Sequence, residues 1–172
     1  MSKSLKAPDA GAQYHPWSTS ILAREEARRR GDRRVGTEHV LLALLVHPSL
    51  ASAVGADAQR ARATLERMDG DALAAIGLEH PPDAPPLPAG DPHTIPARPK
   101  LKAVLRGHMR LTPAATAVLR ESSKGMRRGA SHPGPEHILA GLLELQRPDP
   151  AAELLAALGA EPATVRARLA DA

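Results

Sequence analysis

Two stretches of the chain carry the same pattern of polar and apolar positions. The first runs from Gly36 to Leu45 and the second from Gly134 to Leu143, and six of their ten residues are identical. Each begins with a glycine, continues with a Glu-His pair and then places leucines three and four residues apart. This spacing predicts two amphipathic helices, each with one buried face. The buried positions are Leu41, Leu44 and Leu45 in the first helix, and Leu139, Leu142 and Leu143 in the second.

Further helices are predicted on both sides of the first stretch. A helix beginning near Trp17 or Ser18 should end at Gly31 in a left-handed cap, and the Gly36 helix should end at His47, before Pro48. A third, short helix covers 50–54, and a fourth, capped by Asp57, runs from Ala58 to about Met68. Four short helices in about fifty residues therefore form one unit.

The second unit repeats the first with a changing offset. Gly36 matches Gly134, Pro48 matches Pro148, and the Gly-Ala-acid sequence at 55–57 matches 159–161, so the offset grows from 98 to 104. We therefore expect a third helix about one turn longer at 151–158, capped by Asp149. The predicted organisation is a flexible tail at 1–16, a first repeat at 17–69, a proline-rich linker with short helical segments at 70–110, and a second repeat at 111–172.

Composition supports an all-α fold. The apolar fraction of 42% comes mainly from Ala, Leu and Val, with one Trp, one Tyr and no Phe, which favours closely packed helices over a β architecture. The absence of Cys excludes disulfides and thiolate metal sites. No apolar run has the length of a membrane span, so we expect a cytoplasmic protein without a membrane partner.

The charge pattern leaves one alternative function open. The formal net charge is +4, and arginines gather between Arg28 and Arg34. A basic regulator that binds nucleic acid would use this region. The same arginines also suit the negative end of a helix, and we favour this interpretation.

Candidate chemistry is limited to the two Glu-His pairs. Glu38 and Glu136 could pair with guanidinium groups or could only complement a helix dipole, while Thr37 could cap exposed backbone N–H groups. His39 and His137 have no second His at ligand spacing, so we interpret them as structural and predict no metal. Ser122, Ser123 and Lys124 lack a nucleophile elbow, and the chain has no Walker A motif. We therefore expect neither an enzyme nor a cofactor.

The duplicated pattern resembles the Clp repeat, which occurs in tandem as the N-terminal domain of Clp-family AAA+ unfoldases. The resemblance rests on Glu-Glu-Ala-Arg-Arg-x-Gly, a loop, then Gly-Thr-Glu-His and leucines, and it covers about 17–68 and 111–172. It implies two pseudo-symmetric four-helix repeats packed together, without the ATPase modules. It also implies binding to Clp ATPase or protease components, to their substrates or adaptors, or to peptide ligands.

The resemblance also suggests a ligand site. In ClpC-type members, each repeat contributes a Thr at the start of its first helix and the Glu of Thr-Glu-His to a pocket for phosphorylated arginine. Glu38 and Glu136 match the two acids, and Thr112 matches the second Thr. The first Thr is not kept, since Gln13 occupies its position, and Pro135 replaces the Thr of the second Thr-Glu-His. The motif residues Gly36, Thr37, His39, Gly134 and His137 are expected to be structural.

Overall fold

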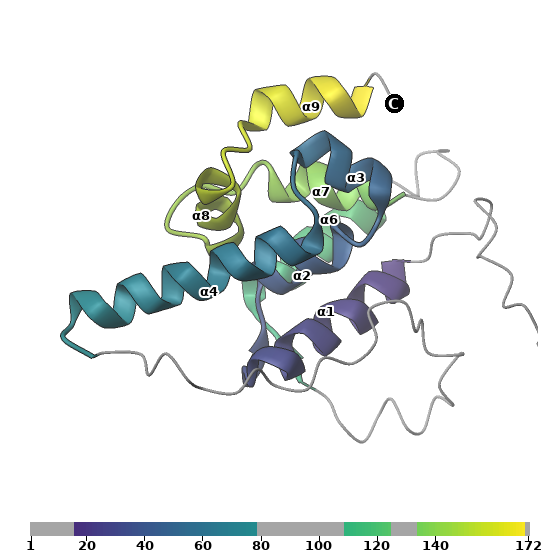
Figure 1. The fold of residues 1–172 in the computed structure, drawn as a ribbon. Coiled ribbons are helices and arrows are strands. Elements are labelled where there is room, and N and C mark those ends of the chain that lie inside the picture. The colour runs from purple at the N-terminus through teal and green to yellow at the C-terminus, as the bar shows by residue number, and fades with distance from the viewer. Residues whose placement is uncertain (1–15, 79–108, 125–133, 171–172) are drawn as a thin grey trace, which may run out of the picture.

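A computed structural model describes residues 16–78, 109–124 and 134–170 of the chain. Within these ranges the protein is mostly helical, as predicted, with eight helices and one short parallel bridge (Figure 1). The predicted tail and most of the predicted linker lie outside the described residues. The elements are α1 (Pro16–Arg30), β1 (Arg34–Val35), α2 (Thr37–Leu44), α3 (Pro48–Val54), α4 (Ala58–Ala75), β2 (Arg110–Leu111), α6 (Pro113–Lys124), α7 (Pro135–Leu142), α8 (Pro150–Ala157) and α9 (Pro162–Ala170).

Helix α2 occupies the centre of the molecule. It contacts α1, α4, α6, α7 and α8, and Glu38 is its only residue that is not buried. A helix that is surrounded in this way must be apolar on every side, and Val40 to Leu44 satisfy this requirement. None of the described helices is long and apolar enough to cross a membrane by itself; α2 and α3, bent by 115°, pass that test of length and composition only as a pair.

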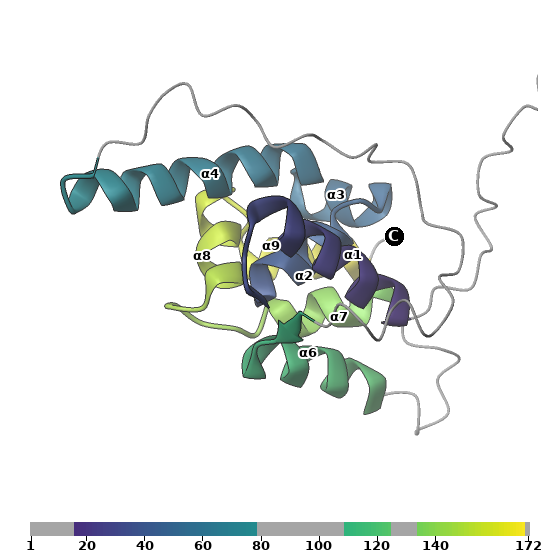
Figure 2. The same cartoon turned by 90° about the horizontal axis from the view of Figure 1, so that it is seen from below.

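The helices before and after the 79–108 segment share one hydrophobic core. Helix α3 packs against α7 and α9, and both α2 and α4 pack against α8 (Figures 1 and 2). Buried residues from both halves, such as Leu41, Leu50, Leu139 and Leu154, belong to a single cluster. Burial of this shared apolar surface therefore holds the two halves together.

A two-residue parallel bridge joins the two halves near the start of α2. Arg34 pairs with Arg110, and Val35 pairs with Leu111. Val35 is buried and Leu111 is half-buried, whereas both arginines are exposed. The bridge was not predicted, because two residues are too few to produce a recognisable alternation of apolar and polar positions.

Four of the described helices, α1, α3, α4 and α8, are followed within two residues by a glycine in the left-handed conformation. The prediction for α1 is confirmed: Gly31 has φ 76°, and the Asp32 N–H donates to the Ala27 carbonyl. The predicted end of the fourth helix near Met68 is wrong, because α4 continues through Gly70 to Ala75 and Gly77 caps it at φ 78°. One internal glycine costs about 1 kcal/mol, and the alanines that follow favour helix.

The prediction that the third helix is about one turn longer in the second unit is also wrong. Helix α8 has eight residues and α3 has seven, so they differ by only one residue. Most of the added length lies before α8, where residues 143–149 replace the three residues 45–47. Pro150, rather than Pro148, occupies the first helical position that Pro48 occupies in α3. The prediction that Asp149 caps this helix is confirmed, since its carboxylate accepts from the Ala151 N–H at 2.9 Å.

A largely buried ion pair fastens α4 to α1. The Arg62 guanidinium donates to both oxygens of Glu26, at 2.6 and 2.9 Å, and these hydrogen bonds raise the pKa of Arg62. The Glu26 side chain is only 7% exposed. Removing one partner of a buried pair leaves the other charge without compensation, which is far more costly than losing an exposed pair.

We predict that Glu26→Gln lowers the free energy of unfolding by about 3 kcal/mol. Glu25→Gln is the matched control, because Glu25 is the neighbouring glutamate on α1 and its pair with Arg28 is exposed. We expect this control to change stability by less than about 1 kcal/mol. Urea denaturation followed by circular dichroism measures both values, and similar losses in the two variants would contradict the importance of the buried pair.

Candidate functional site

An open groove of about 590 Å³ lies where three helices begin. Its walls come from the loop after α1 and from the first residues of α2, α6 and α8. The lining residues are Asp32, Arg33, Arg34, Gly36, Thr37, Glu38, Thr112, Pro113, Ala114, Asp149 and Pro150. The groove therefore combines residues from both halves of the chain.

The parallel bridge brings the starts of α2 and α6 together. Each strand is followed after one residue by its helix, with Gly36 as the N-cap of α2 and Thr112 directly before α6. The Thr112 N–H donates to the Val35 carbonyl at 2.8 Å, which extends the bridge by one hydrogen bond. The Thr112 hydroxyl accepts from the Ala115 N–H at 3.2 Å and caps α6. Because the strands are parallel, both helices begin at the same end of the bridge.

A side-chain hydrogen bond joins the start of α8 to the start of α2. The Thr37 hydroxyl donates to Asp149 Oδ1 at 2.7 Å. Our prediction that Thr37 caps its own helix is therefore wrong: Gly36 is the N-cap, and Thr37 is the first helical residue. Asp149 caps α8 with the same oxygen, so one carboxylate holds two helix starts together.

The side chain of Glu38 folds back over Gly36. A Cβ atom at position 36 would collide with the Glu38 carboxylate, and the same relation holds between Gly134 and Glu136. The Glu38 side chain is 15% exposed, and its Oε2 is buried without a hydrogen-bond partner among the described residues. This oxygen therefore has unused capacity to accept a hydrogen bond.

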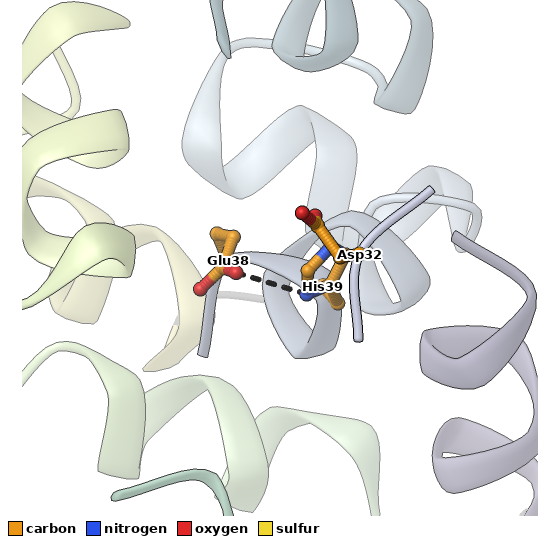
Figure 3. Close-up of side chains that lie close together, drawn as sticks. All are labelled: Asp32, Glu38 and His39. Atoms are coloured by element: carbon orange, nitrogen blue, oxygen red, sulfur yellow. Dashed lines mark hydrogen bonds and ion pairs between the residues drawn. The ribbon is translucent and has the colours of Figure 1, made fainter. Parts of the chain in front are cut away.

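His39 holds the backbone at the start of α2. Its ring is 0% exposed, its Nδ1 accepts from the Gly36 N–H at 3.0 Å, and its Nε2 lies 2.9 Å from Asp32 Oδ2. The neutral ring therefore carries its proton on Nε2 and donates it to Asp32. Glu38 Oε1 also lies 2.9 Å from Nδ1, the contact drawn in Figure 3.

Asp32, Glu38 and His39 also lie close enough to share a metal ion, with their ligand atoms within 4.8 Å of one another. The two carboxylates approach the imidazole at different nitrogens. Both ring nitrogens already have a hydrogen-bond partner, and a metal would have to replace one of them. Hydrogen bonding therefore explains the arrangement of these three side chains, and we do not propose a metal site there.

The second Glu-His pair lies outside this groove. Gly134 is the N-cap of α7, and Glu136 and His137 in its first turn are both exposed. Glu136 lies close to His47: burial lowers the pKa of His47, and the charge of Glu136 acts in the opposite direction. The structure thus brings Glu38 and Thr112 together, but Glu136 does not join them.

Several groove residues were not predicted as site residues. Arg33 and Arg34 were considered as part of a nucleic-acid site or as helix-end cations, Asp32 was expected only in the loop after the first helix, and Asp149 only as a cap. The sequence offered only local signals: Asp149 stands directly before Pro150, and Arg33 stands directly before Arg34. Nothing local indicated that the three helix starts would meet.

Both signs of charge line the groove. Asp32, Glu38 and Asp149 supply carboxylates, whereas Arg33 and Arg34 supply guanidinium groups. The groove also lies at the N-terminal ends of α2, α6 and α8, where the helix dipoles add partial positive charge. The site is therefore suited to a ligand that carries both a positively charged hydrogen-bond donor and a negatively charged acceptor.

Fold and groove together define a mostly helical module with a groove at a junction of helix starts, and sequence comparison relates this module to known chaperones. No family model matches the chain. It is 29% identical, over 155 residues and 87% of its length, to the chloroplastic chaperone protein ClpC2 of Oryza sativa subsp. japonica and to chloroplastic ClpC of Pisum sativum. Chloroplastic ClpC1 of Arabidopsis thaliana gives the same values. The chain spans only 14% of the length of these relatives.

We predict that His39→Ala lowers the free energy of unfolding by about 3 kcal/mol, because the change opens a cavity and leaves the buried Gly36 N–H without an acceptor. His137→Ala is the control at the corresponding position of α7. Its side chain is exposed, so stability should change by less than about 0.5 kcal/mol. Thermal and urea unfolding measure both variants, and equal effects would show that the two histidines have equivalent roles.

Proposed function

We propose that the protein is a non-enzymatic binding module built from two Clp repeats and related to the N-terminal domain of Clp unfoldases. In this proposal, the groove binds segments of protein substrates, adaptors or other peptides. The module thereby assists or modulates a Clp chaperone-protease. No enzymatic role is proposed, because the 172 residues contain no phosphate-binding loop and no recognisable catalytic constellation.

Similarity to ClpC chaperones supports the family level of the proposal. The aligned region covers most of this chain but a small part of each relative, as expected of a module that works beside a motor. The shared core supports the interpretation as two repeats, because α3 packs on α9 and α2 packs on α8 across the two halves. The repeated Gly-x-Glu-His at the starts of α2 and α7 supports it as well.

The observation that carries the binding proposal is the meeting of Glu38 and Thr112 in one groove. Glu38 lines the groove with a side chain that is 15% exposed, and its buried carboxylate oxygen has no partner among the described residues. A ligand guanidinium would pair with this carboxylate once the side chain turns toward the groove. The Thr112 hydroxyl and the helix starts would hold an anionic group nearby. Phosphorylated arginine, which the family resemblance implies, combines both features and is one candidate ligand.

Nucleic acid is a weaker candidate. Part of the arginine cluster is neutralised within the molecule, since Arg30 pairs with both Asp32 and Asp69 and Arg28 pairs with Glu25. Three carboxylates line the groove beside the remaining arginines. A continuous phosphate backbone would meet repulsion there.

The test is an affinity capture of proteins from an extract of the source organism, quantified by mass spectrometry. We predict that immobilised wild-type protein retains Clp components or their clients, and that Glu38→Gln lowers their recovery by about tenfold through the loss of a charged contact. Glu136→Gln should retain the wild-type level, because Glu136 occupies the same helical position outside the groove.

Circular dichroism should first show that both variants are folded. Recovery of no Clp component by the wild type would overturn the proposed function. Equal losses in the two variants would overturn the assignment of binding to this groove.

A further inference from the structure

Two exposed arginines stand side by side on the parallel bridge. Arg34 of β1 and Arg110 of β2 are in register, and their neighbours Val35 and Leu111 turn toward the core. Paired residues on adjacent strands project from the same face, so the two guanidinium groups lie on the outer side of the bridge. Arg33, also exposed, precedes Arg34 and lines the groove with it. We call Arg33, Arg34 and Arg110 the arginine rim.

The arginine rim has no counter-charge among the described residues. The nearby carboxylates have other partners: Asp32 binds Arg30 and His39, and Asp149 binds Thr37 and the Ala151 N–H. Within the part of the chain that the structure describes, no ion pair joins any of the three arginines to an acid. Like charges directly opposite each other on paired strands destabilise the pairing. The fold therefore retains an unfavourable pair beside the groove that a bound anion would relieve.

We propose that the arginine rim binds an acidic segment of a peptide ligand whose neighbouring basic residue enters the groove toward Glu38. This inference rests on the proposed function and specifies the charge pattern of the peptide that the groove binds. Acidic side chains of the peptide pair with Arg34 and Arg110 over the bridge. A basic side chain a few residues away pairs with the Glu38 carboxylate, which turns from Gly36 toward the groove to meet it.

The lining of the groove favours a peptide over a nucleic acid. A polyanion would gain from three arginines, but its next phosphates would approach Glu38, Asp149 and Asp32. A peptide can change the sign of its charge within a few residues and so match both regions. The edge of a short bridge also suits an extended chain.

The test uses the whole protein and fluorescence anisotropy with three labelled probes. The first is a peptide with two adjacent glutamates followed, after a short spacer, by an arginine. The second replaces both glutamates by glutamines, and the third is a single-stranded oligonucleotide. We expect the acidic peptide to bind at least about tenfold more tightly than the glutamine peptide, and salt to weaken this binding.

Arg34→Gln with Arg110→Gln should weaken binding of the acidic peptide by about tenfold or more. Arg67→Gln with Arg120→Gln is the control, because it removes the same charge from exposed positions outside the groove. The rim variant should be at least as stable as the wild type in urea, since it removes a repulsive pair. The loss of affinity in the rim variant would therefore not be caused by impaired folding.

Three outcomes would overturn the inference: no binding of the acidic peptide by the wild type, equal losses in the rim and control variants, or tighter binding of the oligonucleotide with the same loss in the rim variant. The last outcome would assign the rim to nucleic acid. Wild-type capture of Clp components that depends on Glu38 would leave the proposed function standing in each case. If the wild type captures no Clp component but still prefers the acidic peptide, the proposed function is overturned and the proposed charge preference of the arginine rim stands.

Discussion

Burial of α2 on all sides is the constraint on which the rest of the structure depends. A helix start at the centre of a protein has N–H groups that cannot reach bulk water, so they need partners within the molecule. His39 is the side chain that connects this helix start to the preceding loop, because its ring binds the Gly36 N–H with one nitrogen and Asp32 with the other. Asp32 in turn binds Arg30 at the end of α1. A chain of hydrogen bonds thus fixes the path from α1 through β1 to α2.

The position of the groove follows from the same path. Once β1 is fixed, the parallel bridge determines where β2 ends and where α6 begins. Thr37, as the first residue of α2, then reaches Asp149 and sets the start of α8. The three helix starts meet because the β1–β2 pair and the Thr37 hydroxyl connect them. Each helix start contributes polar atoms that do not pack in the hydrophobic core. The position of the groove is therefore a direct consequence of how the central helix is held.

Local physics explains why some of these features could be read from the sequence. The glycine that ends α1, the aspartate caps of α4 and α8, and the buried leucines of α2 and α7 each depend on a few neighbouring residues. The bridge, the Thr37 to Asp149 bond and the choice of Glu38 over Glu136 for the groove depend on partners far away in the chain. Thr37 shows the difference: a threonine at a helix start ordinarily caps that helix, but the Thr37 hydroxyl instead donates a hydrogen bond to a carboxylate more than one hundred residues away.

The two Glu-His motifs show how one sequence pattern can serve different ends. In α2 the helix is enclosed, so His39 is buried and acts on the backbone, and Glu38 is held against it with one free oxygen. In α7 only Ile138, Leu139 and Leu142 are buried, so the same pair faces outward. Glu136 also lies near His47. His47 is the N-cap residue of α3, just as Asp149 is the N-cap residue of α8. A carboxylate at one helix start and an imidazole at the other give the two Glu-His motifs different electrostatic surroundings. The two copies of the motif therefore share the extended backbone of the N-cap glycine, whereas the surroundings of the Glu-His pair depend on which neighbouring helix start faces it.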